Sequence, residues 1–256
     1  MIATNSPYMT RHPCLRRLLA CLGTVLFAAG MWAQTASPFV SGAWSGNVTS
    51  TSATACIRLN ASGLRARLAV SGNDQLSSPV FSVAETSAAT AGNVVSLDIV
   101  GLQPNTTYYY GFEINGTLRT ETLSRGRFRT FPQGAGNLRI ALIGDMDHRD
   151  ATSVVAAASA AVIAEQPHVL LLNGDLHYYD LTTNVAEDYR AAIDNSLKDP
   201  NLGAMFRSAA VAYNWDDHDF SGGDNSNSTG AGSAVIRAVF RDYVRSEEHT
   251  SELQSH

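Results

Sequence analysis

Short runs of alternating apolar and polar residues fill the chain between residues 38 and 131. Runs such as ACIRLNA, LRARLAV and VVSLDIV are separated by turn-forming clusters such as SGND and ATAGN. Several short alternating strands at intervals of about 8 to 12 residues are typical of an antiparallel β-sandwich. The pattern therefore predicts a sandwich domain over residues 38–131.

The segment LQPNTTYYYGF is the most specific local signal in this domain. The part that ends at Tyr108 resembles the tyrosine corner of fibronectin type III and related sandwiches, in which the tyrosine hydroxyl hydrogen-bonds backbone just upstream. Tyr108, Tyr110 and Phe112 fall on one face of the predicted strand. We interpret this aromatic row as core packing, although such a row could also bind carbohydrate.

A different pattern follows a linker at residues 132–137 that contains one proline and two glycines. The apolar run LRIALIGD, an Ala-rich segment at 151–164 and the run PHVLLLNGD predict a strand, a helix and a strand. A second helix is predicted near residues 184–197, before the strand VAYNWDD. Continuous hydrophobicity indicates strands covered on both faces, and hence a parallel sheet. Residues 138–244 are therefore predicted to form an α/β domain.

Acidic residues close each of these three strands. Asp145 and Asp175 each follow a glycine and lie 30 residues apart, the length of one βαβ unit, and Asp216 and Asp217 close the third strand. A single Gly-Asp pair is commonly a turn or a helix cap. Three acidic ends at one sheet edge, where α/β sheets place their ligands, repel one another unless a multivalent cation lies among them. The pattern therefore predicts metal binding.

Composition narrows the class of protein. The chain has 256 residues, 45% hydrophobic and 16% charged, with a formal net charge of −5. These values are typical of a globular protein of one or two domains and indicate no nucleic-acid-binding surface. Cys14 and Cys21 lie in the leader described next, so Cys56 is left as a single thiol that forms no internal disulfide.

Both ends of the sequence differ from the part between them. Residues 1–36 combine arginines with the run LLACLGTVLFAAGMWA, which is shorter than a membrane span and typical of a secretory signal peptide. We therefore expect a secreted or periplasmic protein, without a membrane span once the signal is removed, and LRRLLA leaves a twin-arginine route open. Residues 245–256, RSEEHTSELQSH, are similar to a translated sequencing-library adaptor. We expect this tail to be an artefact on a C-terminally truncated chain, and we exclude it from the site.

Two Gly-Asp corners followed by an acid–histidine corner resemble the metallophosphoesterase superfamily. The forms GDLHY and WDDHD, behind a fibronectin-like domain that ends in GRFRTFP, resemble the PhoD-like alkaline phosphatases over about residues 40–244. The resemblance implies an N-terminal antiparallel β-sandwich, fibronectin type III-like, followed by an incomplete α/β metallophosphoesterase domain. It also implies an exported enzyme that hydrolyses phosphate mono- or diesters through activation of water by two metal ions.

The same resemblance assigns roles to individual residues. Asp175 would bridge both metal ions, Asp145 would bind the first and Asp217 the second. Tyr178 matches the family's phenolate ligand, although it could also be an ordinary aromatic wall of the site, and His218 would donate to the phosphate. Ligands that are mostly oxygen favour hard cations such as Ca²⁺, Mg²⁺ or Mn²⁺, whereas a tyrosine oxygen favours ferric iron. The resemblance implies iron with calcium.

Several neighbouring residues could support these ligands or contact the substrate. They are Asp147, His148, His177, Asp216 and Asn225. The two histidines could equally be solvated or capping, and His168, which opens a strand, is interpreted as structural. The first corner departs from the family, because Asp145 stands where many members carry cysteine and Asp147 where the superfamily carries histidine.

Two other interpretations remain open. In the first, the chain is a secreted adhesion or carbohydrate-binding sandwich protein whose acidic corners bind structural calcium. The second concerns this chain alone, because metallophosphoesterases supply further histidine ligands from a later G-D/H-x-H segment and none precedes Val244. We therefore expect this chain to bind metal poorly and to have little activity.

Overall fold

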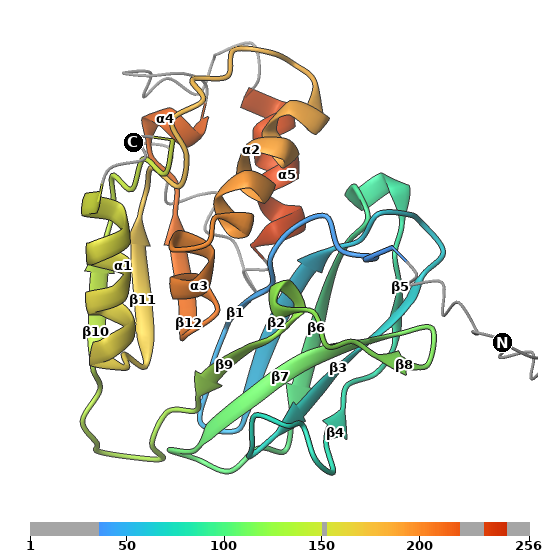
Figure 1. Ribbon diagram of the computed structural model, residues 1–256, viewed down its shortest axis with the longest axis vertical. Helices are drawn as coiled ribbons and strands as arrows, with labels where there is room; N and C mark the ends of the chain where they lie inside the picture. Colours follow the sequence, from blue (N-terminus) through green and yellow to red (C-terminus); the bar gives the residue numbers. More distant parts are fainter. Residues whose placement is uncertain (1–35, 150–152, 221–232, 245–256) are drawn as a thin grey trace, which may run out of the picture. The chain divides into compact units, whose positions relative to one another are not determined.

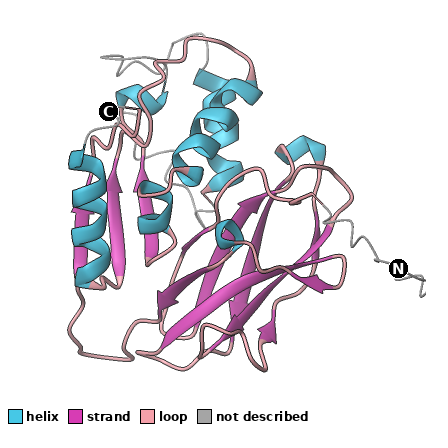
Figure 2. Cartoon of the chain, viewed as in Figure 1, coloured by secondary structure: helices cyan, strands magenta, loops and turns pink. Residues whose placement is uncertain are grey.

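The computed structural model describes residues 36–149, 153–220 and 233–244. From Ser37 onward, the described residues belong to one compact unit. Two six-stranded sheets organise the described residues (Figures 1 and 2). The first sheet has the order β10 (Ile140–Ile143), β11 (Val169–Asn173), β12 (Ala210–Asn214), β1 (Trp44–Gly46), β2 (Ser52–Arg58) and β6 (Val94–Val100). The second has the order β4 (Val80–Phe81), β3 (Arg65–Ser71), β7 (Thr107–Ile114) and β8 (Thr117–Leu118), with β5 (Glu85–Thr86) beside β3 and β9 (Gly126–Arg129) beside β7.

The helices are short and fall mostly in the second half of the chain. They are α1 (Ser153–Glu165), α2 (Ala186–Lys198), α3 (Leu202–Phe206), α4 (Asp217–Phe220) and α5 (Ser233–Tyr243), with the 3₁₀ turns η1 (Ala89–Ala91) and η2 (Thr122–Ser124) in the first half. The predicted helices at 151–164 and 184–197 correspond to α1 and α2, and residues 151 and 152 lie outside the described part.

The strands between residues 38 and 131 pair mainly antiparallel, as the alternating pattern predicts. Tyr110 and Phe112 of β7 are buried in the core between the two sheets, with Tyr108 packed against it. The Tyr108 hydroxyl accepts a hydrogen bond from the backbone N of Gln103 at 2.9 Å, which confirms the tyrosine corner. Burial of this aromatic row favours core packing over a carbohydrate surface.

Strand β2 departs from the simple alternation of a sandwich, because it is buried on both faces. Ala55 and Ile57 face the core between the sheets, whereas Cys56 packs in a second core with residues of α2 and α5. Arg58 lies on the same face of β2 as Cys56 and is buried as well. A charged residue at such a position needs partners, and these come from α2.

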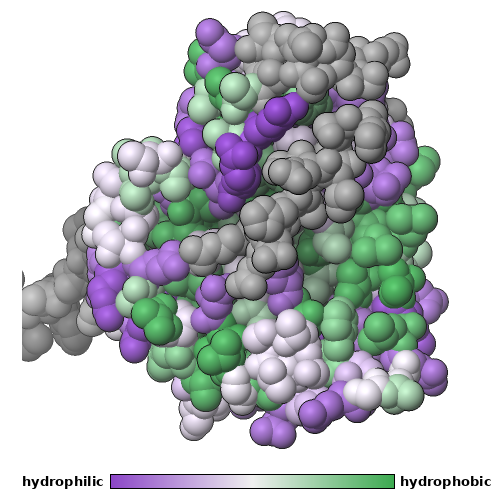
Figure 3. Space-filling view, turned by 180° about the vertical axis from the view of Figure 1, so that it is seen from behind, coloured by the Kyte–Doolittle hydropathy of each residue, from purple (hydrophilic) through white to green (hydrophobic). Residues whose placement is uncertain are grey.

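The parallel sheet is confirmed, but its predicted coverage on both faces is wrong for the described residues. β10, β11 and β12 are parallel neighbours, and α1 and α3 lie on one side of them (Figure 1). On the other side Ile140, Leu142 and Leu171 are 53%, 72% and 37% exposed. Apolar side chains gather there in the view from behind (Figure 3). Continuous hydrophobicity therefore marks a second apolar face that no described element covers.

One sheet runs through both predicted domains. β1, from the first half of the chain, pairs in parallel with β12 through Ser45 and Ala210. The backbone N of Arg127 also donates to the carbonyl of Arg207 at 2.8 Å, which ties β9 to the segment before β12. The strand that leads to the third acidic corner is thus held in register by residues near the start of the described chain.

Cys56 is expected to resist thiol reagents in the folded protein. It is 4% exposed, and burial raises the pKa of its thiol from 9.0 to about 12. The thiolate is the reactive form, so alkylation at pH ~8 should be slower than in the unfolded chain by about a thousandfold. The measurement is modification kinetics with and without denaturant in a Cys14→Ser/Cys21→Ser variant. Equal rates in the two conditions would contradict the burial of this thiol.

Candidate metal centre

The first two acidic corners share an unusual backbone conformation. Asp145 follows β10 and Asp175 follows β11, and both residues have φ of 54°. Residues other than glycine rarely adopt this left-handed conformation, and such residues cluster at functional sites. Because β10 and β11 are parallel neighbours, the two strained corners lie at the same edge of the sheet.

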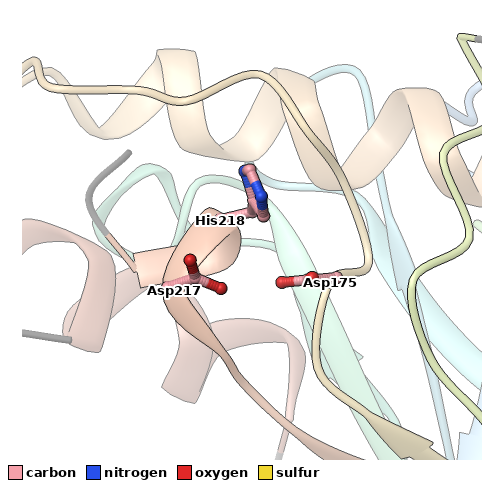
Figure 4. A group of neighbouring side chains, drawn as sticks. All are labelled: Asp175, Asp217 and His218. Carbon is pink, nitrogen blue, oxygen red and sulfur yellow. The ribbon is translucent and has the colours of Figure 1, made fainter. Parts of the chain in front are cut away.

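Three side chains converge at this edge (Figure 4). Asp175, Asp217 and His218 each offer one ligand atom, and these atoms lie within 4.8 Å of one another. Asp175 is 6% exposed, and its Oδ1 is buried without a hydrogen-bond partner among the described residues. Burial raises the pKa of Asp175, and the charges of Asp217 and Asp145 add to the increase. A buried carboxylate oxygen without a donor fits the place of a cation ligand.

Tyr178 joins Asp145 to this group. Its hydroxyl donates to Asp175 Oδ2 at 2.9 Å and lies 3.1 Å from Asp145 Oδ1. Burial and these two carboxylates raise the pKa of Tyr178. All five residues that the resemblance assigns to the metal ions and the phosphate therefore lie in one cluster, which we call the acidic centre: Asp145, Asp175, Tyr178, Asp217 and His218.

The strand that leads to the third corner is shorter than predicted. β12 ends at Asn214 rather than at Asp216 or Asp217, and α4 begins at Asp217. The helical turn places Asp217 and the following His218 beside Asp175. Sequence pattern alone cannot locate such a turn, because four residues are too few to show helical periodicity.

Asp219 holds the second and third corners together, a role that the sequence analysis missed. It is 2% exposed, and its Oδ1 accepts from the backbone N of Leu176 at 2.8 Å and of His177 at 3.3 Å. Its Oδ2 accepts from the backbone N of Asp216 at 3.2 Å. Burial raises the pKa of Asp219 to about 6. In the sequence, Asp219 is marked by its position in the run DDHD, but that run does not show whether an aspartate binds a metal ion or holds the backbone of neighbouring loops in place.

His218 is held by the loop that carries Asp175. Its Nδ1 lies 2.5 Å from Asp180 Oδ1, and its ring lies 4.2 Å from the Tyr178 ring, between centroids. Burial by itself would lower the pKa of His218, but the bond to Asp180 and the nearby carboxylates raise it. Asp180 is a second residue that the sequence analysis did not single out.

Two of the supporting candidates lie near the acidic centre with partners of their own. Asp147 forms a two-point ion pair with Arg149, at 2.9 Å in both contacts, which lowers the pKa of Asp147. Asp216 is exposed and accepts from the backbone N of Asp217 at 2.9 Å. Neither belongs to the group of close ligand atoms.

The other three candidates are placed differently. His148 lies with Nδ1 3.4 Å from the Ser196 hydroxyl, and His177 is 1% exposed, with its pKa lowered by burial to about 4. Both rings contact the Tyr179 ring rather than the acidic centre. Asn225 lies outside the described residues. His168 is buried at the start of β11, where its Nδ1 accepts from the backbone N of Arg139 at 3.1 Å.

Comparison with known protein families points to the same family that the sequence motifs resemble. Residues 27–132 match the family model described as the N-terminal domain of PhoD-like phosphatases. The resemblance to the PhoD-like phosphatases that was inferred from the sequence is thereby confirmed.

Solved structures add the comparison of folds. The chain is similar to the structure of PhoD with a TM-score of 0.68 and 18% identity, over 82% of this chain and 46% of that chain. It therefore spans about half the length of that structure. The sensor domain of the anti-sigma factor RsgI4 in Pseudobacteroides cellulosolvens is 17% identical over 36% of this chain and 88% of its own, with a TM-score of 0.27. No curated protein matches the sequence.

Proposed function

We propose that the gene product is an exported, metal-dependent phosphatase that hydrolyses phosphate mono- or diesters. The observation that carries the proposal is the acidic centre, in which the second and third corners bring ligand atoms of Asp175, Asp217 and His218 within 4.8 Å of one another, beside a buried Asp175 oxygen that lacks a donor among the described residues. In an enzyme of this family, such a group is better suited to hold cations than to stabilise the fold, because carboxylates at close range repel each other.

The residues of the acidic centre would bind the two cations in different ways. Asp175 would contact two cations, Asp145 and Tyr178 one of them, and Asp217 the other. The donor set is rich in oxygen and suits hard cations, and the family resemblance favours iron with calcium. When bound, two such ions polarise the phosphate and lower the pKa of a water molecule.

The remaining steps fall to the protein's own side chains. His218 would donate a hydrogen bond to a phosphate oxygen and so stabilise the negative charge that grows during displacement. Asp219 would keep His218 and Asp175 at a fixed separation, because it bonds backbone on both sides of the centre. These roles need no covalent intermediate.

The proposed organisation keeps the sequence-based boundaries. Residues 1–36 would be a signal peptide, residues 38–131 a fibronectin type III-like sandwich domain and residues 138–244 the first part of a metallophosphoesterase domain. The location would be secreted or periplasmic. Among the described residues, no helix combines the length and hydropathy that membrane crossing requires. Activity is proposed for a gene product of the length of PhoD, and we expect the present chain to show little.

Replacing Asp175 with asparagine is expected to abolish phosphatase activity in the complete gene product. The change keeps the shape but removes a negative charge, so activity should fall by at least about a thousandfold. The measurement is metal-dependent release of phosphate from a chromogenic ester.

Asp188→Asn provides the matched control, because Asp188 is an exposed aspartate in the first turn of α2. This variant should keep full activity. Unchanged turnover in Asp175→Asn would reject the assignment. Calcium binding without turnover of any phosphate ester would favour the adhesion protein with structural calcium instead.

A further inference from the structure

We propose that Arg149 is a specificity-determining residue, which binds a phosphate oxygen of the substrate and makes phosphomonoesters the preferred substrate class. The inference rests on the proposed function, because it names the class of ester that the acidic centre would hydrolyse. Arg149 lies four residues beyond Asp145, in the loop after β10. The sequence analysis did not single it out, because a lone arginine in a loop belongs to none of the acidic corners.

Arg149 lies beside the acidic centre. The central carbon of its guanidinium is 5.9 Å from the centroid of the Tyr178 ring and 5.3 Å from that of the Tyr179 ring. The Tyr178 hydroxyl bonds to Asp175 at 2.9 Å and lies 3.1 Å from Asp145. A single tyrosine side chain therefore separates this cation from two carboxylates of the centre.

Asp147 holds the arginine at one edge of the guanidinium. Its Oδ1 accepts from the Arg149 backbone N at 3.0 Å and from Nε at 2.9 Å, and its Oδ2 accepts from Nη2 at 2.9 Å. Nη1 has no hydrogen-bond partner among the described residues, and the side chain is 40% exposed. The two N–H donors of Nη1 are therefore left to meet a ligand that enters from solvent.

A phosphate oxygen is the ligand that suits this arrangement. A guanidinium is always charged and binds phosphate through charge-assisted hydrogen bonds. The two-point bond to Asp147 and the contacts with two tyrosine rings restrict the rotamers of Arg149, so binding costs little further side-chain entropy. An arginine at a phosphate site also stabilises the negative charge that spreads over the equatorial oxygens during phosphoryl transfer.

The charge of the substrate decides which ester gains from Arg149. The second pKa of a phosphomonoester is about 6, so at alkaline pH the group is a dianion with three strong acceptor oxygens. A diester is a monoanion, because a second ester group takes the place of one charged oxygen. An added cation attracts the dianion more strongly. With His218 as one donor and Arg149 as a second, the site therefore favours the monoester.

The test compares two substrates in the complete gene product. Arg149→Met should lower kcat/KM by about 100-fold for a chromogenic phosphomonoester and by less than about threefold for the diester with the same leaving group. Inhibition by inorganic phosphate should weaken by about tenfold, because the product carries the same charged oxygens. Arg149→Lys keeps the charge but not the fork, and should recover part of the activity towards the monoester.

Arg139→Met is the matched control, because Arg139 is an exposed arginine directly before β10, at the other end of the strand from Asp145. This variant should hydrolyse both esters at the unsubstituted rates. Equal losses for the two esters in Arg149→Met, or no loss for the monoester, would overturn the role of Arg149 and leave the phosphatase assignment intact. If the unsubstituted enzyme hydrolysed neither ester, the proposed function would fail, and this inference with it.

Discussion

Replacing Arg58 with methionine is expected to lower the free energy of unfolding by about 3 to 5 kcal/mol, the cost of leaving a buried charge without its partner. Arg58 Nη1 lies 2.7 Å from Asp194 Oδ2, and the side chain of Asp194 is only 2% exposed. The Tyr243 hydroxyl donates to the other oxygen of Asp194 at 2.6 Å, so removing the arginine leaves that carboxylate one side-chain donor among the described residues. The measurement is urea unfolding followed by tryptophan fluorescence.

Arg58 provides its own control, because it bonds two carboxylates in different surroundings. Glu187 is 61% exposed and lies 2.6 Å from Nη2. Glu187→Gln should therefore cost less than about 1 kcal/mol, as exposed ion pairs do. The double variant Arg58→Met/Asp194→Leu should recover part of the loss, because it removes both buried charges. Equal losses in Arg58→Met and Glu187→Gln would show that burial of Asp194 does not set the effect.

The buried ion pair between Arg58 and Asp194 is an example of a feature of the fold that the sequence pattern does not predict. Alternating hydrophobicity predicts the strands of the sandwich correctly, and continuous hydrophobicity predicts the parallel sheet. The pattern ACIRL says nothing, however, of the second buried face of β2, because a long-range partner decides whether Arg58 is exposed. The sheet that runs through both predicted domains could not be predicted either, because the pairing of β1 with β12 joins residues that are far apart in the sequence.

In and around the acidic centre, some residues could be predicted from the sequence and others could not. Asp145, Asp175 and Asp217 could be predicted because parallel strands bring their carboxyl ends to one edge. Asp180 and Asp219 could not, because each acts through a loop or a four-residue helix whose course only tertiary structure fixes. The sequence thus indicates the groups that would touch a cation but not those that hold the groups in place.

Gly174→Ala is expected to lower the free energy of unfolding by about 3 to 5 kcal/mol, because two penalties coincide at this position. Gly174 has φ of 80°, a conformation in which a side chain is strained. An added Cβ would also lie 2.3 Å from Asp216 Cβ and 3.0 Å from the Asp216 backbone N. One of the two corners would have to move, and with it Asp175 or Asp217. Urea unfolding of the variant measures the sum of both penalties.

Gly63→Ala separates the two penalties. Gly63 has almost the same φ, 81°, but a Cβ there would meet nothing within 4 Å. This variant should lose only the backbone part, about 1 kcal/mol. The difference between the two variants then measures how closely the second and third corners approach each other. If Gly174→Ala loses no more than Gly63→Ala, those corners are not in contact in solution, and the carboxylates that they carry would lie too far apart to share a cation.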